Sequence, residues 1–154
     1  MWLTAARALV YFFCTVSLTI TADDVFHVHH DGGVVLTAYH WADAHTVSLD
    51  NVCVLAIKAE NTGDGAGLLA STSTGVVTDT SWKCSSGGGA VEQTGWHLPD
   101  FDDAAWSQAR VVAANDGSVW PSVLAGINPA AQWIWSQDSS DDVIYCRKLL
   151  CWLH

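Results

Sequence analysis

Hydrophobic and polar positions alternate over short runs along most of the chain, and turn residues separate these runs. Residues 25–29 alternate in this way and end at Asp31-Gly32-Gly33, so residues 34–38 are expected to return as the second strand of a hairpin. The almost continuously apolar run 52–57 predicts a buried strand. Further strands are expected at 46–49, 133–135 and 143–146. Many short strands with turns between them predict an all-β sandwich or barrel.

An apolar run near the N-terminus has two interpretations. Residues 8–20 follow a short segment with one positive charge and precede small residues, as in a signal peptide. The run is too short to anchor the chain in a bilayer, and no later segment is long and apolar enough to cross one. Residues 16–21, however, alternate between apolar and hydroxyl side chains, which is typical of a half-buried first strand. The division that we favour has three parts: a signal peptide (1–21), a domain (22–147) and a short C-terminal tail (148–154).

The net charge limits the partners that the chain can bind. The sequence has 16 acidic residues against six Lys and Arg, a formal net charge of −10 at pH 7. Nucleic acids and anionic membranes bind clustered Lys and Arg, so neither is expected as a partner. Nearly all of the acidic residues are Asp, which is typical of turns and loops. The nine Trp exceed what a core of this size needs, and such enrichment is typical of sugar-binding sites and protein interfaces.

The cysteine count bears on the redox compartment. Removal of a signal peptide would take Cys14 with it and leave Cys53, Cys84, Cys146 and Cys151. An even number in a secreted chain favours disulfides, with three possible connectivities. No two of the four have the CxxC spacing of a zinc site. The cysteines therefore predict a secreted, extracellular protein, and a cytosolic chain with free thiols is the alternative.

Four stretches together resemble the galactose-binding-like jelly-roll family. The most specific one is the signature GW-x-x-P-x-FDD-x-x-W between Gly95 and Trp106. The other three stretches are an ADD-x-F hairpin (21–32), a strand and loop (59–70), and the pair WIW and YCR (133–135 and 145–147). The order and spacing hold from Thr21 to Arg147. Similar patterns occur in extracellular, shell-matrix-like animal modules and in accessory domains of rhamnosidase- and galactosidase-type glycosidases.

This resemblance implies an all-β jelly-roll β-sandwich that is galactose-binding-domain-like. It also implies a disulfide between Cys84 and Cys146, because both lie in strand-like segments that match cysteines of the family. The signature itself has two interpretations: its carboxylates hold a cation or a sugar hydroxyl, or they cap a turn while its aromatic side chains plug the sandwich. We favour the structural interpretation for Trp96, Phe101, Asp102, Asp103 and Trp106.

Metal chemistry has weaker support in the sequence. His27 and His29 lie two residues apart and share one face of the expected strand, but no third ligand has suitable spacing, so a solvent-facing strand is favoured and no metal site is predicted. The acidic segments 23–24 and 138–142 can take a structural calcium ion, as domains of this family often do, although solvated turns are the simpler interpretation. No other cofactor is expected.

Ligand-binding residues are expected on loops, because the strands of a jelly roll supply the frame. Two loops place a Trp beside short polar side chains outside any strand pattern. The candidate ligand-binding residues are Tyr39, His40, Trp41 and Asp43 in the first loop and Asn115, Asp116 and Trp120 in the second. Trp133 and Trp135 share one face of a strand, either as a stacking platform for sugars or as part of the core.

The sequence gives little support for catalysis. It has no G-x-S-x-G elbow, and adjacent carboxylates such as Asp102 and Asp103 point in different directions instead of facing one substrate. We therefore expect a non-catalytic extracellular module whose partner is a carbohydrate or another matrix component. Two alternatives stay open: an acidic, mineral-associated matrix protein that binds calcium, and an accessory domain detached from a glycosidase.

Overall fold

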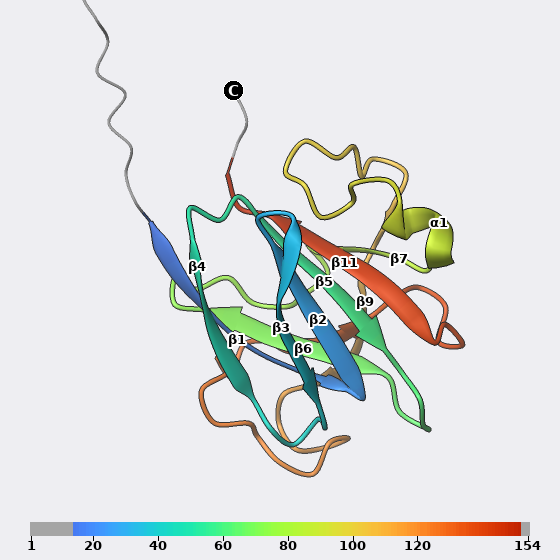
Figure 1. Cartoon of the computed structure of the whole chain (residues 1–154). Helices are drawn as coiled ribbons and strands as arrows, with labels where there is room; N and C mark the ends of the chain where they lie inside the picture. Colours follow the sequence, from blue (N-terminus) through green and yellow to red (C-terminus); the bar gives the residue numbers. More distant parts are fainter. Residues whose placement is uncertain (1–13, 152–154) are drawn as a thin grey trace, which may run out of the picture.

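The computed structural model describes residues 14–151, and within them two antiparallel β-sheets pack face to face (Figure 1). The five-stranded sheet has the order β4 (His45–Asp50), β1 (Thr15–Asp23), β6 (Gly67–Thr72), β10 (Gln132–Trp135) and β9 (Arg110–Ala114). The six-stranded sheet has the order β3 (Gly33–Tyr39), β2 (Val25–His30), β5 (Val54–Glu60), β11 (Val143–Leu149), β7 (Lys83–Ser85) and β8 (Ser107–Gln108). One short helix, α1 (Gly88–Glu92), is described. The predicted all-β sandwich is confirmed.

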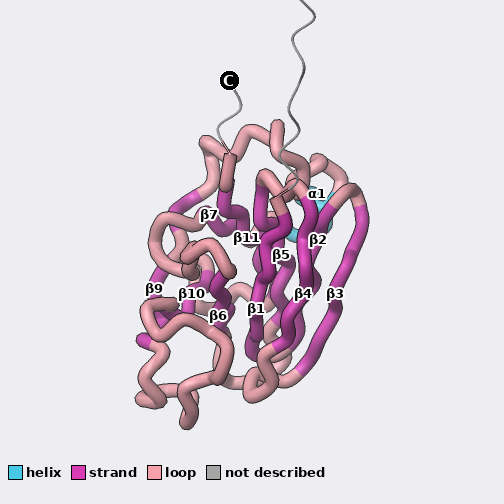
Figure 2. Tube along the Cα trace, turned by 90° about the vertical axis from the view of Figure 1, so that its left-hand side faces the viewer, coloured by secondary structure: helices cyan, strands magenta, loops and turns pink. Residues whose placement is uncertain are grey.

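Most strands pair with partners that are distant in the sequence, because the chain repeatedly crosses from one sheet to the other (Figure 2). β1, for example, lies between β4 and β6, with Ile20 opposite both His45 and Ala70. The expected hairpin is present as β2 and β3, with a register shift after Val28. No helix in the described part of the chain is long and apolar enough to cross a membrane.

The main core fills the space between the sheets. Alternate residues of β1 and β2, including Leu18, Ile20, Phe26 and Val28, are almost completely buried there. Trp135 belongs to the same core. Each buried side chain of this size contributes about 1.5–3 kcal/mol by leaving water, so the strand alternation is the main source of stability.

The favoured boundary at residue 21 lies within a strand of the structure. Residues 15–23 form β1, which pairs on both edges and buries Val16, Leu18, Ile20 and Thr21. The alternative interpretation, a first strand of the domain, therefore describes this stretch. An apolar run in which every second residue is polar fits both a signal peptide and a strand. Only the pairing with β4 and β6 shows that this run forms a strand in the structure. The remainder of the predicted leader, residues 1–13, lies outside the described residues.

The C-terminal boundary is also corrected. Lys148 and Leu149 continue β11 and pair with β5, and Cys151 forms a disulfide with Cys53. The tail predicted from residue 148 is thus part of the domain as far as residue 151. The second disulfide joins Cys84 and Cys146, the pair that the family resemblance implied, which lie opposite each other on β7 and β11.

The GW-x-x-P-x-FDD-x-x-W segment lies on the outer face of the six-stranded sheet. There Trp96 and Tyr145 are buried and form a small cluster with the partly buried Phe101 and Trp106. The expectation that Phe101 and Trp106 plug the sandwich is wrong in its location: the segment covers the sheet from outside, because Tyr145 points outward while its neighbours on β11 point inward.

The Trp133 and Trp135 pair is buried and does not form a stacking platform. The two indoles pack into different clusters, and the pairing of β10 with β9 shifts by one residue of β9 between Trp133 and Ile134. Trp135 lies between the sheets, whereas Trp133 lies under the loop that joins β9 to β10.

Candidate functional site

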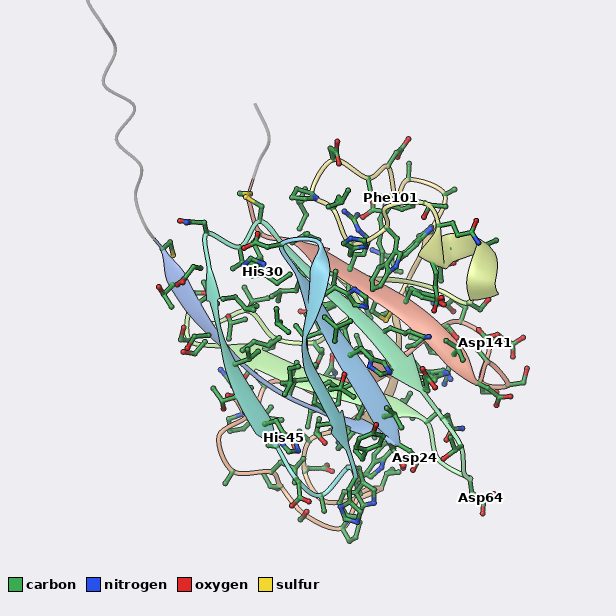
Figure 3. All side chains as sticks on the ribbon, viewed as in Figure 1. Asp24, His30, His45, Asp64, Phe101 and Asp141 are labelled. Atoms are coloured by element: carbon green, nitrogen blue, oxygen red, sulfur yellow. A yellow bond between two sulfur atoms is a disulfide. The ribbon has the colours of Figure 1, made fainter. Side chains whose placement is uncertain are left out.

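Several loops converge on a hollow at the end of the sandwich where β1 finishes. The hollow has a volume of about 540 Å³, and we call it the loop-end hollow. Asp24 and Asp64 lie at this end in Figure 3. The lining side chains that carry chemistry or bulk are Asp23, Trp41, Asp64, Arg110, Val119 and Trp120. The elements that supply the lining are the end of β1, strand β9, and the β3–β4, β5–β6, β9–β10 and β10–β11 loops.

One wall of the loop-end hollow is the edge of a stacked pair of indoles. The Trp120 ring lies on Trp133, with ring centroids 4.1 Å apart, and the Trp120 indole N–H donates to Asp23 Oδ2 at 3.0 Å. Gly67 allows this close approach, because a Cβ there would lie 2.8 Å from both indoles. Because Gly67 has no side chain, the two stacked indoles can lie directly against β6 and form this wall.

Trp41 forms another part of the wall. Its side chain is partly buried against the Trp120–Trp133 cluster, and its carbonyl oxygen accepts a hydrogen bond from the Thr21 hydroxyl at 2.9 Å. The exposed His40 ring stacks on the Trp41 indole, with the centroids 6.1 Å apart. Trp41 thus presents a partly exposed aromatic surface to the hollow from a fixed backbone position.

Asp23 and Asp24 are neighbouring carboxyl groups at the end of β1, and Asp23 lines the hollow. Burial raises the pKa of Asp23 to about 6, and the hydrogen bond with Asp24 adds to this shift. The pKa of Asp24 is lowered, first by the hydrogen bond with Asp23 and then by the Thr62 hydroxyl and amide N–H, each 2.7 Å from Asp24 Oδ2. Asp23 is consequently the carboxyl group that takes a proton as the solution becomes mildly acidic.

Arg110 brings a positive charge to the same hollow from β9. Its Nε donates to the Ser136 carbonyl oxygen at 3.2 Å, which orients the guanidinium group. The hollow therefore combines partly exposed aromatic surface, a carboxyl group and a guanidinium group.

The structure brings together only two of the predicted ligand-binding residues. Trp41 and Trp120 both line the loop-end hollow, although they lie far apart in the sequence. Tyr39, His40 and Asp43 are exposed and are not part of its lining. His40 Nδ1 lies 3.7 Å from Asp43 Oδ2.

The second predicted loop needs correction. Trp120 is not a free-standing loop residue: it is 6% exposed, because its ring packs on Trp133 and only its edge reaches the hollow. Asn115 is buried and Asp116 accepts a hydrogen bond from the Ser118 N–H in an exposed turn, so neither lines the hollow.

Sequence reasoning missed Asp23, Asp64 and Arg110 as site residues. Asp23 lies in the acidic segment 23–24 and Asp64 in the strand and loop at 59–70, and nothing in the pattern links these two segments to each other. Arg110 gave no signal, because its role depends on β9 pairing with β10 at the rim.

The acidic segment 138–142 does not gather its carboxylates around a common point. Asp138 accepts from the Ser140 N–H and hydroxyl at 2.8 and 2.6 Å, and Asp141 accepts from the Ser136 hydroxyl at 2.6 Å. Donors within the turn therefore occupy these oxygens. Within residues 14–151, no group of three or more His, Cys, Asp or Glu side chains is arranged to hold a metal ion.

A β-sandwich frame with a hollow formed by its loops is an arrangement typical of small ligand-binding modules. The sequence is similar to an α-L-rhamnosidase from Streptomyces avermitilis, with 34% identity over 135 residues. The match covers 75% of this chain but only 13% of the relative, so the chain spans about an eighth of that protein. No known protein family profile and no solved structure matches the chain. The similarity and the β-sandwich are compatible with an accessory domain of a glycosidase.

Proposed function

We propose that this chain is a non-catalytic, extracellular carbohydrate-binding module that holds a sugar in the loop-end hollow. The observation that carries the proposal is the placement of Trp41 and the edge of Trp120 beside the Asp23 carboxyl group and the Arg110 guanidinium group. Sugars present apolar C–H faces and hydroxyl groups together, and this combination of side chains complements both.

The chemistry of recognition follows from the lining. The C–H face of a pyranose ring packs on the exposed surface of Trp41, while its hydroxyl groups donate to Asp23 and accept from Arg110 in charge-assisted hydrogen bonds. Val112, Val119 and Ala66 supply an apolar surface in the same hollow. Such a surface suits the methyl group of a 6-deoxy sugar, and the similarity to a rhamnosidase makes L-rhamnose the first sugar to test.

The carboxyl groups of the hollow support binding rather than hydrolysis. A glycosidase needs two carboxyl groups on opposite sides of the scissile bond, about 5–9.5 Å apart. Asp23 and Asp24 are instead adjacent in the sequence; Asp23 accepts a hydrogen bond from the Trp120 N–H, and Asp24 accepts from Thr62. We therefore assign them to positioning and to the binding of hydroxyl groups.

Two further parts of the proposal, the family and the extracellular location, are supported by the sequence resemblance and by the disulfides. The GW-x-x-P-x-FDD-x-x-W signature supports membership of the galactose-binding-like jelly-roll family. The two disulfides, Cys53–Cys151 and Cys84–Cys146, support an oxidising extracellular location.

The test is calorimetric titration of the chain with L-rhamnose and rhamnosides, preceded by a glycan array. Trp41→Ala should weaken binding by roughly fivefold or more, because an aromatic contact contributes about 1 kcal/mol beyond its buried area. The matched control is Tyr39→Ala, which removes an exposed aromatic side chain that does not line the hollow and should leave the affinity unchanged.

Three outcomes decide the proposal. Loss of affinity in Trp41→Ala with an unchanged control supports the site. Equal affinity in both variants and the wild type contradicts the loop-end hollow as the binding site. Absence of glycan binding, combined with calcium binding in the same titration format, would favour the alternative of an acidic matrix protein.

A further inference from the structure

A second hollow lies on the outer face of the six-stranded sheet, over β2, β5 and β11, and we call it the sheet-face hollow. It has a volume of about 310 Å³, and three of its lining side chains are His27, His29 and His97. A neighbouring cavity of about 310 Å³ is lined by His29, His30 and His97. His29 and His97 line both cavities and therefore lie at their junction.

His29 and His97 come from separate parts of the chain. His29 lies near the end of β2, and His97 belongs to the segment that covers the sheet from outside. Their ring centroids are 5.4 Å apart, and the buried Trp96 contacts both rings, at 4.9 Å from His29 and 5.9 Å from His97. The indole fixes the position of the pair.

Neither imidazole is committed to a strong interaction among the described residues. His97 Nδ1 is buried and has no hydrogen-bond partner within residues 14–151. A neutral imidazole binds a metal ion through the lone pair of one ring nitrogen.

The spacing of the two imidazole rings fits the binding of one metal ion by both. An imidazole nitrogen binds a transition-metal ion at about 2.0–2.1 Å, which places each ring centroid about 3 Å from the ion and two such centroids about 5–6 Å apart. The observed 5.4 Å lies in this range.

The charged side chains around His29 and His97 allow a cation to bind there. Lys58 lies in the lining, but its Nζ is paired with Glu92 at 2.6 Å and with Glu60 at 3.3 Å, so its positive charge is balanced. Glu92 also accepts a hydrogen bond from the Tyr145 hydroxyl at 2.9 Å, which keeps its carboxylate at the edge of the hollow.

We propose that His29 and His97 bind a divalent transition-metal ion, Cu²⁺ in preference to Zn²⁺, with water in the remaining coordination positions. Imidazole suits both ions, and Cu²⁺ binds more tightly than Zn²⁺ to a given set of nitrogen ligands. The described residues offer two protein ligands here and not a closed structural site, in agreement with the lack of any three-ligand group.

The experiment uses the chain without a histidine tag and titrates it with Cu²⁺ and with Zn²⁺ by calorimetry, with electron paramagnetic resonance of the Cu²⁺ form. His97→Ala and His29→Ala should each weaken Cu²⁺ binding by roughly tenfold or more, since loss of even an outer partner of a metal ligand costs about 10–100-fold. The control is His40→Ala, an exposed imidazole near Asp24 and far from His29 along β2.

The wild-type spectrum should show coupling to nitrogen from two imidazoles, and each single variant should show one. His97→Gln serves as the second variant if an alanine variant fails to fold, which circular dichroism detects. Unchanged Cu²⁺ affinity in a folded His97 variant, or a spectrum without nitrogen coupling, would overturn the proposal. An equal loss in His40→Ala would overturn it as well, because binding would then be spread over surface histidines.

Discussion

Arg147 of β11 is buried and forms an ion pair with Asp103 of the FDD motif. The Arg147 Nε donates to the Trp96 carbonyl oxygen at 2.6 Å, and its Nη2 donates to the Leu98 carbonyl oxygen at 2.8 Å. The Phe101 ring lies 5.1 Å from the guanidinium group. The GW-x-x-P-x-FDD-x-x-W segment thus wraps around one arginine, which explains in physical terms why this motif and the YCR sequence occur together.

Replacement of Asp103 should strongly destabilise the domain. Asp103→Asn removes the charge that balances the 1%-exposed Arg147 side chain and the nearby Lys83. Loss of one partner of a buried pair costs about 3–5 kcal/mol, and we expect the lower end, about 3 kcal/mol, because Asp103 is partly exposed. Chemical denaturation followed by tryptophan fluorescence measures this change.

The neighbouring carboxylate is the matched control. Asp102 is exposed and accepts a hydrogen bond from the Ala104 N–H in its own turn, so Asp102→Asn should cost less than about 1 kcal/mol. Equal losses for the two variants would show that the motif acts through its turn and not through Arg147.

The disulfides lead to a prediction about thiol chemistry. Of the five cysteines, four are paired and Cys14 is exposed and free in the described residues, so the native protein should have one reactive thiol and the reduced, unfolded chain five. A thiol-reactive chromophore counts both states. Cys14→Ser should have none in the native state, and two or more reactive thiols in the native wild type would contradict the pairing.

Reduction should also lower stability. The residues of Cys84–Cys146 lie 62 positions apart, and constraining such a loop in the unfolded chain contributes about 4 kcal/mol in the chain-entropy model. Thermal melting with and without reductant measures the combined effect of both bridges.

Asp23 should make stability depend on pH between about 4 and 6. The native pKa of about 6 lies above the ordinary value of 3.8, so in this window the native state keeps a proton that the unfolded state has released. The free energy of unfolding should therefore fall as pH rises through the window. Asp24 has the opposite shift, and its stabilising effect is lost only as pH falls below its ordinary pKa.

The variant Asp23→Asn isolates this effect. It keeps an oxygen that accepts the Trp120 N–H, and should be more stable than the wild type by about 2 kcal/mol at about pH 7.5, allowing for coupling to Asp24, with little difference at about pH 4. Denaturation curves at both pH values provide the measurement. A variant less stable than the wild type at the higher pH would mean that the Asp23 charge is favourable in the folded protein.

The strands were largely predictable because alternation along a strand is a local property. Residues 25–29 and 34–38 form the expected hairpin, and the apolar run at 52–57 includes most of β5. The same local logic left residues 15–21 with two interpretations, because a leader and a strand share one pattern. For Trp133 and Trp135 the local pattern left a stacking platform and the core as alternatives; both indoles are buried, but in different clusters.

The sequence alone determined the class of fold and the positions of several strands along the chain, since strand alternation depends on residues close together in the chain. Only the tertiary structure decided which side chains meet at a site. Trp41 and Trp120 share the loop-end hollow, and His29 meets His97, because strands distant in sequence pair within the sheets and carry their loops to the same place. Such pairing is fixed by burial across the whole domain, which no local pattern contains.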